Sequence, residues 1–175
     1  SADAAELVGE QLGAFKDNIA GVNLQYAKSK NLTVYDVLTI ASMVEREVSV
    51  PKERSTVAAV IYNRLKMGEP LGIDATIRFA LDNWTEPLTE SDLATDSPYN
   101  TRLNGGLPPG PIGNPGLASI EAAANPAKTD VWLYVVKPGT CGEHVFASSL
   151  DEHNANVAAY EEAQAAAGGS PTDCG

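Results

Sequence analysis

The sequence predicts an α+β fold in which several helices pack with a small antiparallel β-sheet. Apolar residues recur at helical spacing through the first half of the chain. After Asn125-Pro126 the pattern becomes extended, in two short runs rich in branched and aromatic residues. Residues 97–116, dense in Gly, Pro and Asn, lie between these parts. We interpret them as a long ordered loop that walls a cleft, because prolines fix the backbone and the interleaved apolar side chains can anchor it.

The composition is that of a globular protein with an excess of acidic side chains. Of the 175 residues, 43% are hydrophobic, which is enough for one domain with a core. The 12 basic and 23 acidic side chains give a formal net charge of −11, which argues against a nucleic-acid partner or an anionic membrane surface. No apolar run reaches the length of about 18 residues that a membrane span needs, and the N-terminus lacks a signal-peptide pattern. We therefore expect either a soluble protein or part of a longer one.

We expect a single domain over residues 1–175, with no internal repeat. Residues 1–32 form an N-terminal helical region, residues 33–166 the core and residues 167–175 a tail. Periodicity and start and stop signals predict helices over residues 4–28, 33–50, 52–68, 76–81, 88–93, 116–124 and 151–166. Residues 131–137 and 143–148 are predicted to pair as a β-hairpin around Pro138-Gly139.

Polar residues are expected at three helix starts. Thr33 and Asp36 have the spacing of a capping box. Asp74 fits the N-cap of the helix at 76–81, and Asn114, which precedes a proline, fits the start of the helix at 116–124.

The helix at 33–50 carries a glutamate where its apolar face should be. Three of the four residues in the row Leu38, Ala41, Glu45 and Val48 are apolar, so Glu45 lies on or beside the buried stripe. A carboxyl group held against apolar neighbours has a raised pKa and can act as a general acid near neutral pH. Glu45 is therefore a candidate catalytic acid.

Glu45 also has a plainer interpretation, as a structural carboxylate paired with Arg54 or Arg64. The same helical pattern turns Arg46 and Glu47 toward water. Because Glu47 lies on another face of the helix, we expect it to be a poor second catalyst.

The chain has two cysteines, Cys141 and Cys174. They could form a disulfide that ties down the tail, remain free thiols, or bind zinc together with His144 and His153. The spacings match no usual zinc pattern, so we favour the disulfide, which would stabilise the fold by about 2–4 kcal/mol and implies an oxidising compartment. We expect no metal and no other cofactor.

Several long motifs resemble the endolytic murein transglycosylase family, the YceG-like domain. The resemblance runs from about residue 32 to about residue 160. The motifs that carry it are ASMVERE at 41–47, VAAVIYNRL at 57–65, DSPYNT at 96–101, GLPPGPIGNPGLASIEAAANPAKTD at 106–130 and GEHVFASS at 142–149.

The resemblance implies an enzyme that cuts the glycan strands of peptidoglycan, with Glu45 as its catalytic acid. Family members usually carry an N-terminal membrane anchor and a small LysM-like region, both absent from this sequence. The chain would then be the extracytoplasmic catalytic part of a protein of the bacterial cell envelope. A cell-wall synthase complex is a candidate partner of the full-length protein.

Polar and aromatic side chains along the chain are candidate substrate contacts. Tyr99 can stack on a sugar ring, and asparagine amides can bond hydroxyl and N-acetyl groups. The alternative for the asparagines is turn chemistry, and for His144 a place at a strand end. The full set is Asn63, Asp74, Tyr99, Asn100, Thr101, Asn114 and His144.

A lytic transglycosylase needs only one carboxyl group, because the glutamate first protonates the glycosidic oxygen and then deprotonates the 6-hydroxyl that closes a 1,6-anhydro ring. Two rival functions stay open. A lysozyme-like hydrolase would need a second carboxylate, for which Asp74 and Asp96 are candidates. A glycan-binding module without activity would use Glu45 only as a structural ion pair.

Overall fold

The computed structural model describes residues 3–172 and 174, and the predicted α+β class is confirmed. The helices are α1 (Ala4–Ala20), α2 (Gln25–Ser29), α3 (Val34–Glu47), α4 (Arg54–Met67), α5 (Asp74–Leu81), α6 (Glu90–Leu93), α7 (Leu117–Ala124) and α8 (Leu150–Ala167), with a 3-10 turn at Pro51–Glu53. The strands are β1 (Leu133–Val136) and β2 (His144–Ala147). None of the described helices combines the length and apolar character needed to cross a bilayer.

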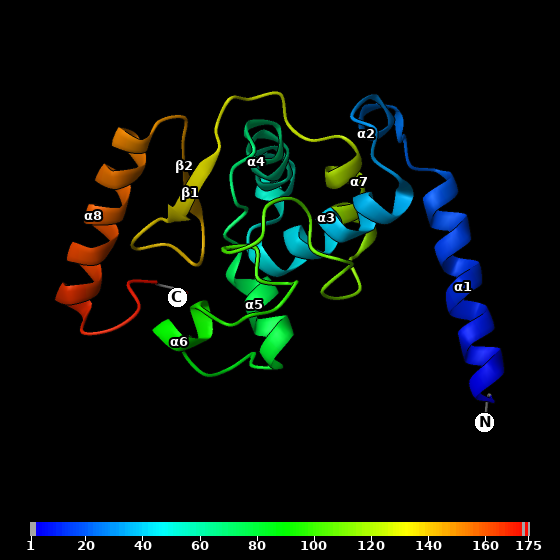
Figure 1. Ribbon diagram of the computed structural model, residues 1–175, viewed down its shortest axis with the longest axis horizontal. Coiled ribbons are helices and arrows are strands. Elements are labelled where there is room, and N and C mark those ends of the chain that lie inside the picture. The colour runs from blue at the N-terminus through cyan, green and yellow to red at the C-terminus, as the bar shows by residue number, and fades with distance from the viewer. Residues whose placement is uncertain (1–2, 173, 175) are drawn as a thin grey trace.

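Helices α3, α4 and α7 form the centre of the molecule (Figure 1). The predicted capping box begins α3, since the Asp36 carboxylate accepts from the Thr33 backbone and the Thr33 hydroxyl accepts from the Asp36 backbone. The apolar side chains of α3 and α4 then meet in a close-packed core. Fully buried members include Val37, Ile40, Met43, Val44, Val57 and Ile61. The centre of the fold thus follows from the helical periodicity.

The predicted hairpin is present, with β1 and β2 antiparallel and Leu133 opposite Ala147. Helix α8 packs against both strands, on the side of the molecule opposite α1 (Figure 1). Cys141, in the hairpin loop, forms a disulfide with Cys174, as predicted. This bond takes both thiols out of any zinc site, so the zinc alternative is wrong.

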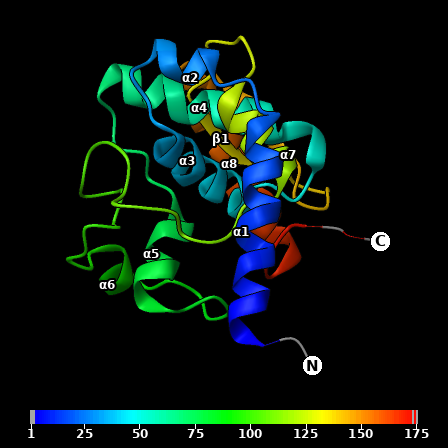
Figure 2. The same cartoon turned by 90° about the vertical axis from the view of Figure 1, so that its right-hand side faces the viewer.

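The predicted helix at 4–28 is instead two helices, because the chain turns between α1 and α2. The amide of Gly21 bonds back to the last carbonyls of α1, where the helix ends. No residue of α1 is buried, and the helix stands beside the body as a separate arm (Figures 1 and 2). Its apolar residues Val8, Leu12 and Phe15 remain exposed, and they line a groove of about 580 Å³ between α1 and the body.

Two predicted helix starts are also corrected. Asp74 is the first residue of α5, and Ile73 is its N-cap, so the Asp74 side chain makes no capping bond. Helix α7 has Gly116 as its N-cap in place of Asn114. Gly68 ends α4 as predicted, with a left-handed φ of 76° that a residue without a Cβ adopts at low cost.

Candidate functional site

The last turn of α3 presents two glutamates to different neighbours. Both Glu45 and Glu47 are half-buried as residues. Glu45 contacts the start of α7, whereas Glu47 contacts β1 and the start of α5. The chemical properties of the two carboxyl groups follow from these neighbours.

The Glu45 carboxylate holds the N-terminus of α7. Its Oε2 accepts a hydrogen bond of 2.5 Å from the Ser119 hydroxyl and one of 3.1 Å from the Gly116 backbone amide. The bond from Ser119 chiefly lowers the Glu45 pKa, with help from Gly116 and from the charges of Arg54 and Arg46, against a smaller effect of burial. The predicted rise in the Glu45 pKa is therefore wrong, because fixed donors outweigh the apolar surroundings.

A polar cavity of about 300 Å³ opens beside Glu45. It is lined by Ser42, Glu45, Arg46, Gly113 and Asn114. The Arg46 guanidinium lies 4.2 Å from the centre of the Trp84 ring, so Arg46 faces outward as predicted and is held by a cation–π contact.

Glu47 does not turn toward water, which corrects the prediction. Its Oε2 accepts a 2.8 Å hydrogen bond from the Tyr134 hydroxyl. Burial raises the Glu47 pKa, and the nearby charge of Asp74 adds to this rise. The hydrogen bond from Tyr134 and the backbone of Ala75 act in the opposite direction, as does His144, but burial is the largest effect. A raised pKa favours the protonated form, which is the form that a general acid needs.

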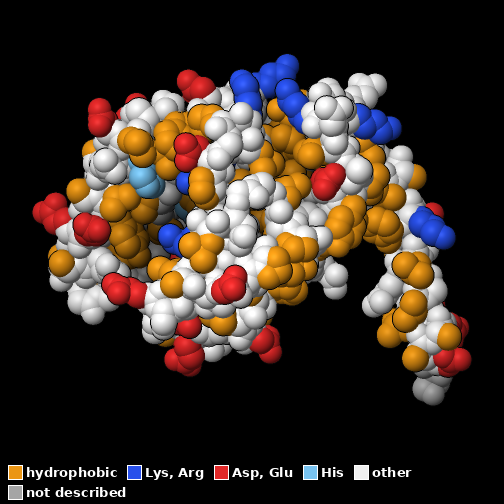
Figure 3. Space-filling view, viewed as in Figure 1, with side chains coloured by type: hydrophobic (Ala, Val, Ile, Leu, Met, Phe, Trp, Pro, Cys, Tyr) orange, Lys and Arg blue, Asp and Glu red, His pale blue; other side chains and the backbone are white. Residues whose placement is uncertain are grey.

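A cleft of about 340 Å³ lies in front of Glu47. Figure 3 shows it as a hollow between α8 and the α5–α6 side, with basic and histidine side chains visible inside. Asp74 and Arg102 form an ion pair within it, with both Nε and Nη2 of Arg102 bonded to Asp74 Oδ1 at 2.9 and 2.7 Å. The lining residues are Glu47, Arg64, Leu71, Gly72, Asp74, Arg102, Tyr134, Val135, His153 and Val157.

The Tyr134 ring packs against the His144 ring. The two rings meet edge to face with centroids 4.9 Å apart. The His144 ring is 6% exposed, and its Nδ1 lies 2.9 Å from Glu53 Oε2. His144 is therefore enclosed and does not line the cleft, but its ring contacts Tyr134, which does.

Two predicted contacts, Asn100 and Thr101, are buried in the loop. The Asn100 amide donates to the carbonyls of residues 93 and 95, and its Oδ1 accepts from the Arg102 backbone. The Thr101 hydroxyl accepts from the Ile73 amide. These bonds fix the positions of Arg102 and of the start of α5, so Asn100 and Thr101 shape the cleft without lining it.

The other predicted contacts are spread over the surface. Asn63 donates its amide to the carbonyls of residues 129 and 131, away from the cleft. Tyr99 packs against Phe79 at 4.8 Å between ring centroids. Asn114 is exposed beside Glu45, and Asp96 is exposed on the loop. Of the predicted set, Asp74 alone lines the Glu47 cleft.

Most residues that line the Glu47 cleft were not predicted as site residues from the sequence. Glu47 follows buried Met43 and Val44 by four and three residues, so the helical rule that selected Glu45 also fits Glu47. Four further polar residues of the cleft come from different elements, namely α4, the loop, β1 and α8, so no local sequence pattern identified them as site residues. They are Arg64, Arg102, Tyr134 and His153.

A sequence model of the YceG-like family matches residues 1–159 of the chain. The chain belongs to the YceG-like family. It is 43% identical over 127 residues to a Bacillus subtilis protein named endolytic murein transglycosylase, which covers 73% of this chain and 35% of that protein. A Streptococcus pneumoniae protein of the same name is 38% identical over 161 residues, covering 88% of this chain and 28% of that protein.

Among solved structures, the chain resembles a YceG-like protein from Listeria monocytogenes. The TM-score is 0.76 at 36% sequence identity, over 88% of this chain and 49% of that one. The YceG-like chain described here thus spans about a third of the curated relatives it matches.

Proposed function

We propose that this YceG-like chain is the catalytic domain of an endolytic murein transglycosylase, with the glycan strands of peptidoglycan as its substrate. The names of its relatives support this assignment. So does a cleft that combines an enclosed carboxyl group with polar side chains suited to a sugar. The working core is residues 33–166, and the tail is tied to it through Cys174.

The observation that carries the proposal is the environment of Glu47. In an enclosed site with a raised pKa, Glu47 fits the general acid better than Glu45, whose pKa is lowered by fixed donors. We therefore assign the acid to Glu47 and give Glu45 a structural role at the start of α7. The sequence alone favours Glu45 as the general acid, so the substitution experiments include both Glu45 and Glu47.

The proposed reaction splits the MurNAc–GlcNAc bond without water. Glu47 donates its proton to the glycosidic oxygen, the C–O bond breaks, and the GlcNAc alcohol leaves. The Glu47 carboxylate then takes the proton from the muramic 6-hydroxyl, whose oxygen bonds to the anomeric carbon and closes a 1,6-anhydro ring. The first step leaves Glu47 in the ionisation state that the second requires, and the Tyr134 hydroxyl, at 2.8 Å, holds the carboxyl group through both.

A lysozyme-like hydrolase is the second candidate, because Asp74 also lines the cleft. One oxygen of Asp74 is held by Arg102, which favours a positioning role for this carboxylate over that of a base. A glycan-binding module without activity is the third candidate function. Binding alone would not require an enclosed carboxyl group such as that of Glu47. In either enzyme, the full-length protein would act in the bacterial cell envelope, where a membrane anchor and a cell-wall synthase complex are proposed.

Mass spectrometry of purified glycan strands, incubated with the domain, tests the proposal. Products that end in 1,6-anhydro-N-acetylmuramic acid, one water lighter than hydrolysis products, are expected. Reducing ends would indicate the hydrolase, and Asp74→Asn would then abolish cleavage. Binding without cleavage, by a domain that is folded, would contradict the assignment of catalysis to this part of the chain.

A further inference from the structure

Arg64 is an enclosed cation without a partner in the described part of the chain. It comes from the last turn of α4 and lines the Glu47 cleft. Its Nε is fully buried and makes no hydrogen bond within residues 3–172 and 174. Burial lowers the Arg64 pKa, although the guanidinium stays protonated, and the charge of Glu69 acts on it without forming an ion pair among these residues.

His153 supplies a second unpartnered nitrogen in the same cleft. Its Nδ1 is buried and makes no hydrogen bond in the described residues. Burial lowers the His153 pKa, and the charge of Arg64 lowers it further, so the imidazole is neutral near pH 7 and can donate one N–H. Arg64 and His153, from α4 and α8, thus line one cavity, and each has a buried nitrogen without a hydrogen-bond partner in the described residues.

Two guanidinium groups, Arg64 and Arg102, line the cleft together with two carboxyl groups, Asp74 and Glu47. Arg102 Nη2 lies 2.7 Å from Asp74 Oδ1, so these two side chains form an ion pair, whereas Arg64 forms none among the described residues. Burial raises the Glu47 pKa, which favours its neutral form and leaves Arg64 without a paired counter-charge.

We propose that Arg64, assisted by His153, binds a carboxylate carried by the substrate next to the glycosidic oxygen that Glu47 protonates. A guanidinium is the side chain best suited to a carboxylate, and a ligand anion would supply the missing partner. On peptidoglycan, two sources offer this group: the free lactyl carboxylate of a peptide-free strand, or a carboxylate of the stem peptide. This inference rests on the proposed glycan substrate and makes the cleft selective for charged strands.

The test measures binding to the Glu47→Gln protein, so that cleavage does not interfere. Peptide-free strand fragments are compared with the same fragments after their lactyl carboxylates have been converted to amides. Peptide-bearing fragments, with stem carboxylates free or amidated, form the second arm. We expect amidation in one arm to weaken binding by about 10- to 100-fold, the effect of losing a charge-assisted hydrogen bond. The arm in which amidation weakens binding identifies which carboxylate, lactyl or stem-peptide, Arg64 binds.

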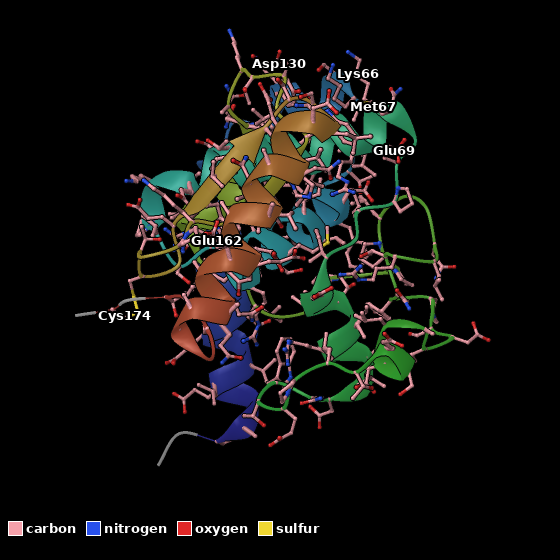
Figure 4. All side chains as sticks on the ribbon, turned by 90° about the vertical axis from the view of Figure 1, so that its left-hand side faces the viewer. Lys66, Met67, Glu69, Asp130, Glu162 and Cys174 are labelled. Atoms are coloured by element: carbon pink, nitrogen blue, oxygen red, sulfur yellow. A yellow bond between two sulfur atoms is a disulfide. The ribbon has the colours of Figure 1, made fainter. Side chains whose placement is uncertain are left out.

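Arg64→Met in the same background should remove this discrimination, and Arg64→Lys should retain part of it. Lys66→Met is the matched control, since it removes one positive charge from the same helix at an exposed position (Figure 4). Thermal unfolding verifies that each variant is folded. Equal affinity for charged and amidated fragments in both arms would overturn the carboxylate site but leave the proposed function intact. Absence of binding to any fragment would instead count against the glycan substrate itself.

Discussion

On one side of the last turn of α3, Glu45 meets the first turn of α7; on the other side, Glu47 meets Tyr134 and the start of α5. Donors that surround Glu45 lower its pKa, and burial raises that of Glu47. The pKa values of two glutamates separated by one residue are thus shifted in opposite directions. The comparison teaches that the ionisation of a side chain is set by what packs against its helix more than by the helix itself.

The largest expected effect is on turnover. Glu47→Gln should lower the rate of glycan cleavage by about 10²–10⁴-fold, the range for loss of a general acid. Glu45→Gln should keep most of the activity, because it removes only the contact to α7. Both rates are measured by chromatography of released fragments, with circular dichroism as the control for folding. If the ranking is reversed, Glu45 is the acid and our assignment fails.

The Tyr134→Phe variant tests the comparison of Glu45 with Glu47 through the pH dependence of kcat. The Tyr134 hydroxyl lowers the Glu47 pKa, so its loss should raise that pKa and move the alkaline limb of kcat to higher pH. Less exact placement of the acid should also lower turnover at neutral pH by about 2- to 10-fold, the equivalent of one hydrogen bond. Tyr26→Phe, remote from the cleft, serves as control. An unchanged limb would mean that another group sets it.

The two glutamates should also differ in their effect on stability. Ionising Glu47 in its enclosed site is unfavourable, so its stability penalty is absent below the ordinary pKa of 4.5 and grows as the pH rises toward the higher folded value. Glu47→Gln should therefore raise Tm at pH 7 and leave it unchanged near pH 3. Ionised Glu45 stabilises the fold above pH 4.5, and this contribution is lost as the pH falls through its lowered folded pKa.

Glu45→Gln should lower the free energy of unfolding at pH 7 by about 0.5–1 kcal/mol, since solvent screens part of the contact. For a chain of this size that corresponds to a fall of about 1–4 °C in Tm. The difference should shrink as the pH falls below 4.5 and disappear below the lowered folded pKa of Glu45. Calorimetry at the two pH values checks both variants, and shifts of the same sign for Glu45→Gln and Glu47→Gln would remove the contrast.

The smallest expected effect is that of Ser119→Ala. The Ser119 hydroxyl donates to Glu45 and accepts from Arg54 Nε at 3.2 Å. Its loss should raise the Glu45 pKa, because this bond is the largest cause of the shift, and should destabilise the fold by about 0.5 kcal/mol. NMR titration of the Glu45 carboxyl carbon measures the shift, and the Glu47 titration should not move.

Local patterns predicted the elements well and their interactions less well. The capping box at Thr33, the end of α4 at Gly68 and the β1–β2 hairpin depend on neighbours in sequence, and all are present. The break between α1 and α2 was missed because the apolar spacing continues across it. Asn100 and Thr101 were identified by residue type, but their polar atoms are used by the loop and by Ile73.

The sequence by itself predicted the α+β class, the β1–β2 hairpin and the disulfide partners, and it drew attention to the last turn of α3. The helical rule placed Glu45 on the buried stripe and turned Glu47 toward water, so it favoured Glu45. The tertiary structure supports the proposal for Glu47, because it brings Ser119 to the Glu45 carboxyl group and Tyr134 to that of Glu47 across more than 70 residues. A pKa depends on atoms within a few ångströms in space, and those atoms are assembled only when distant segments pack together.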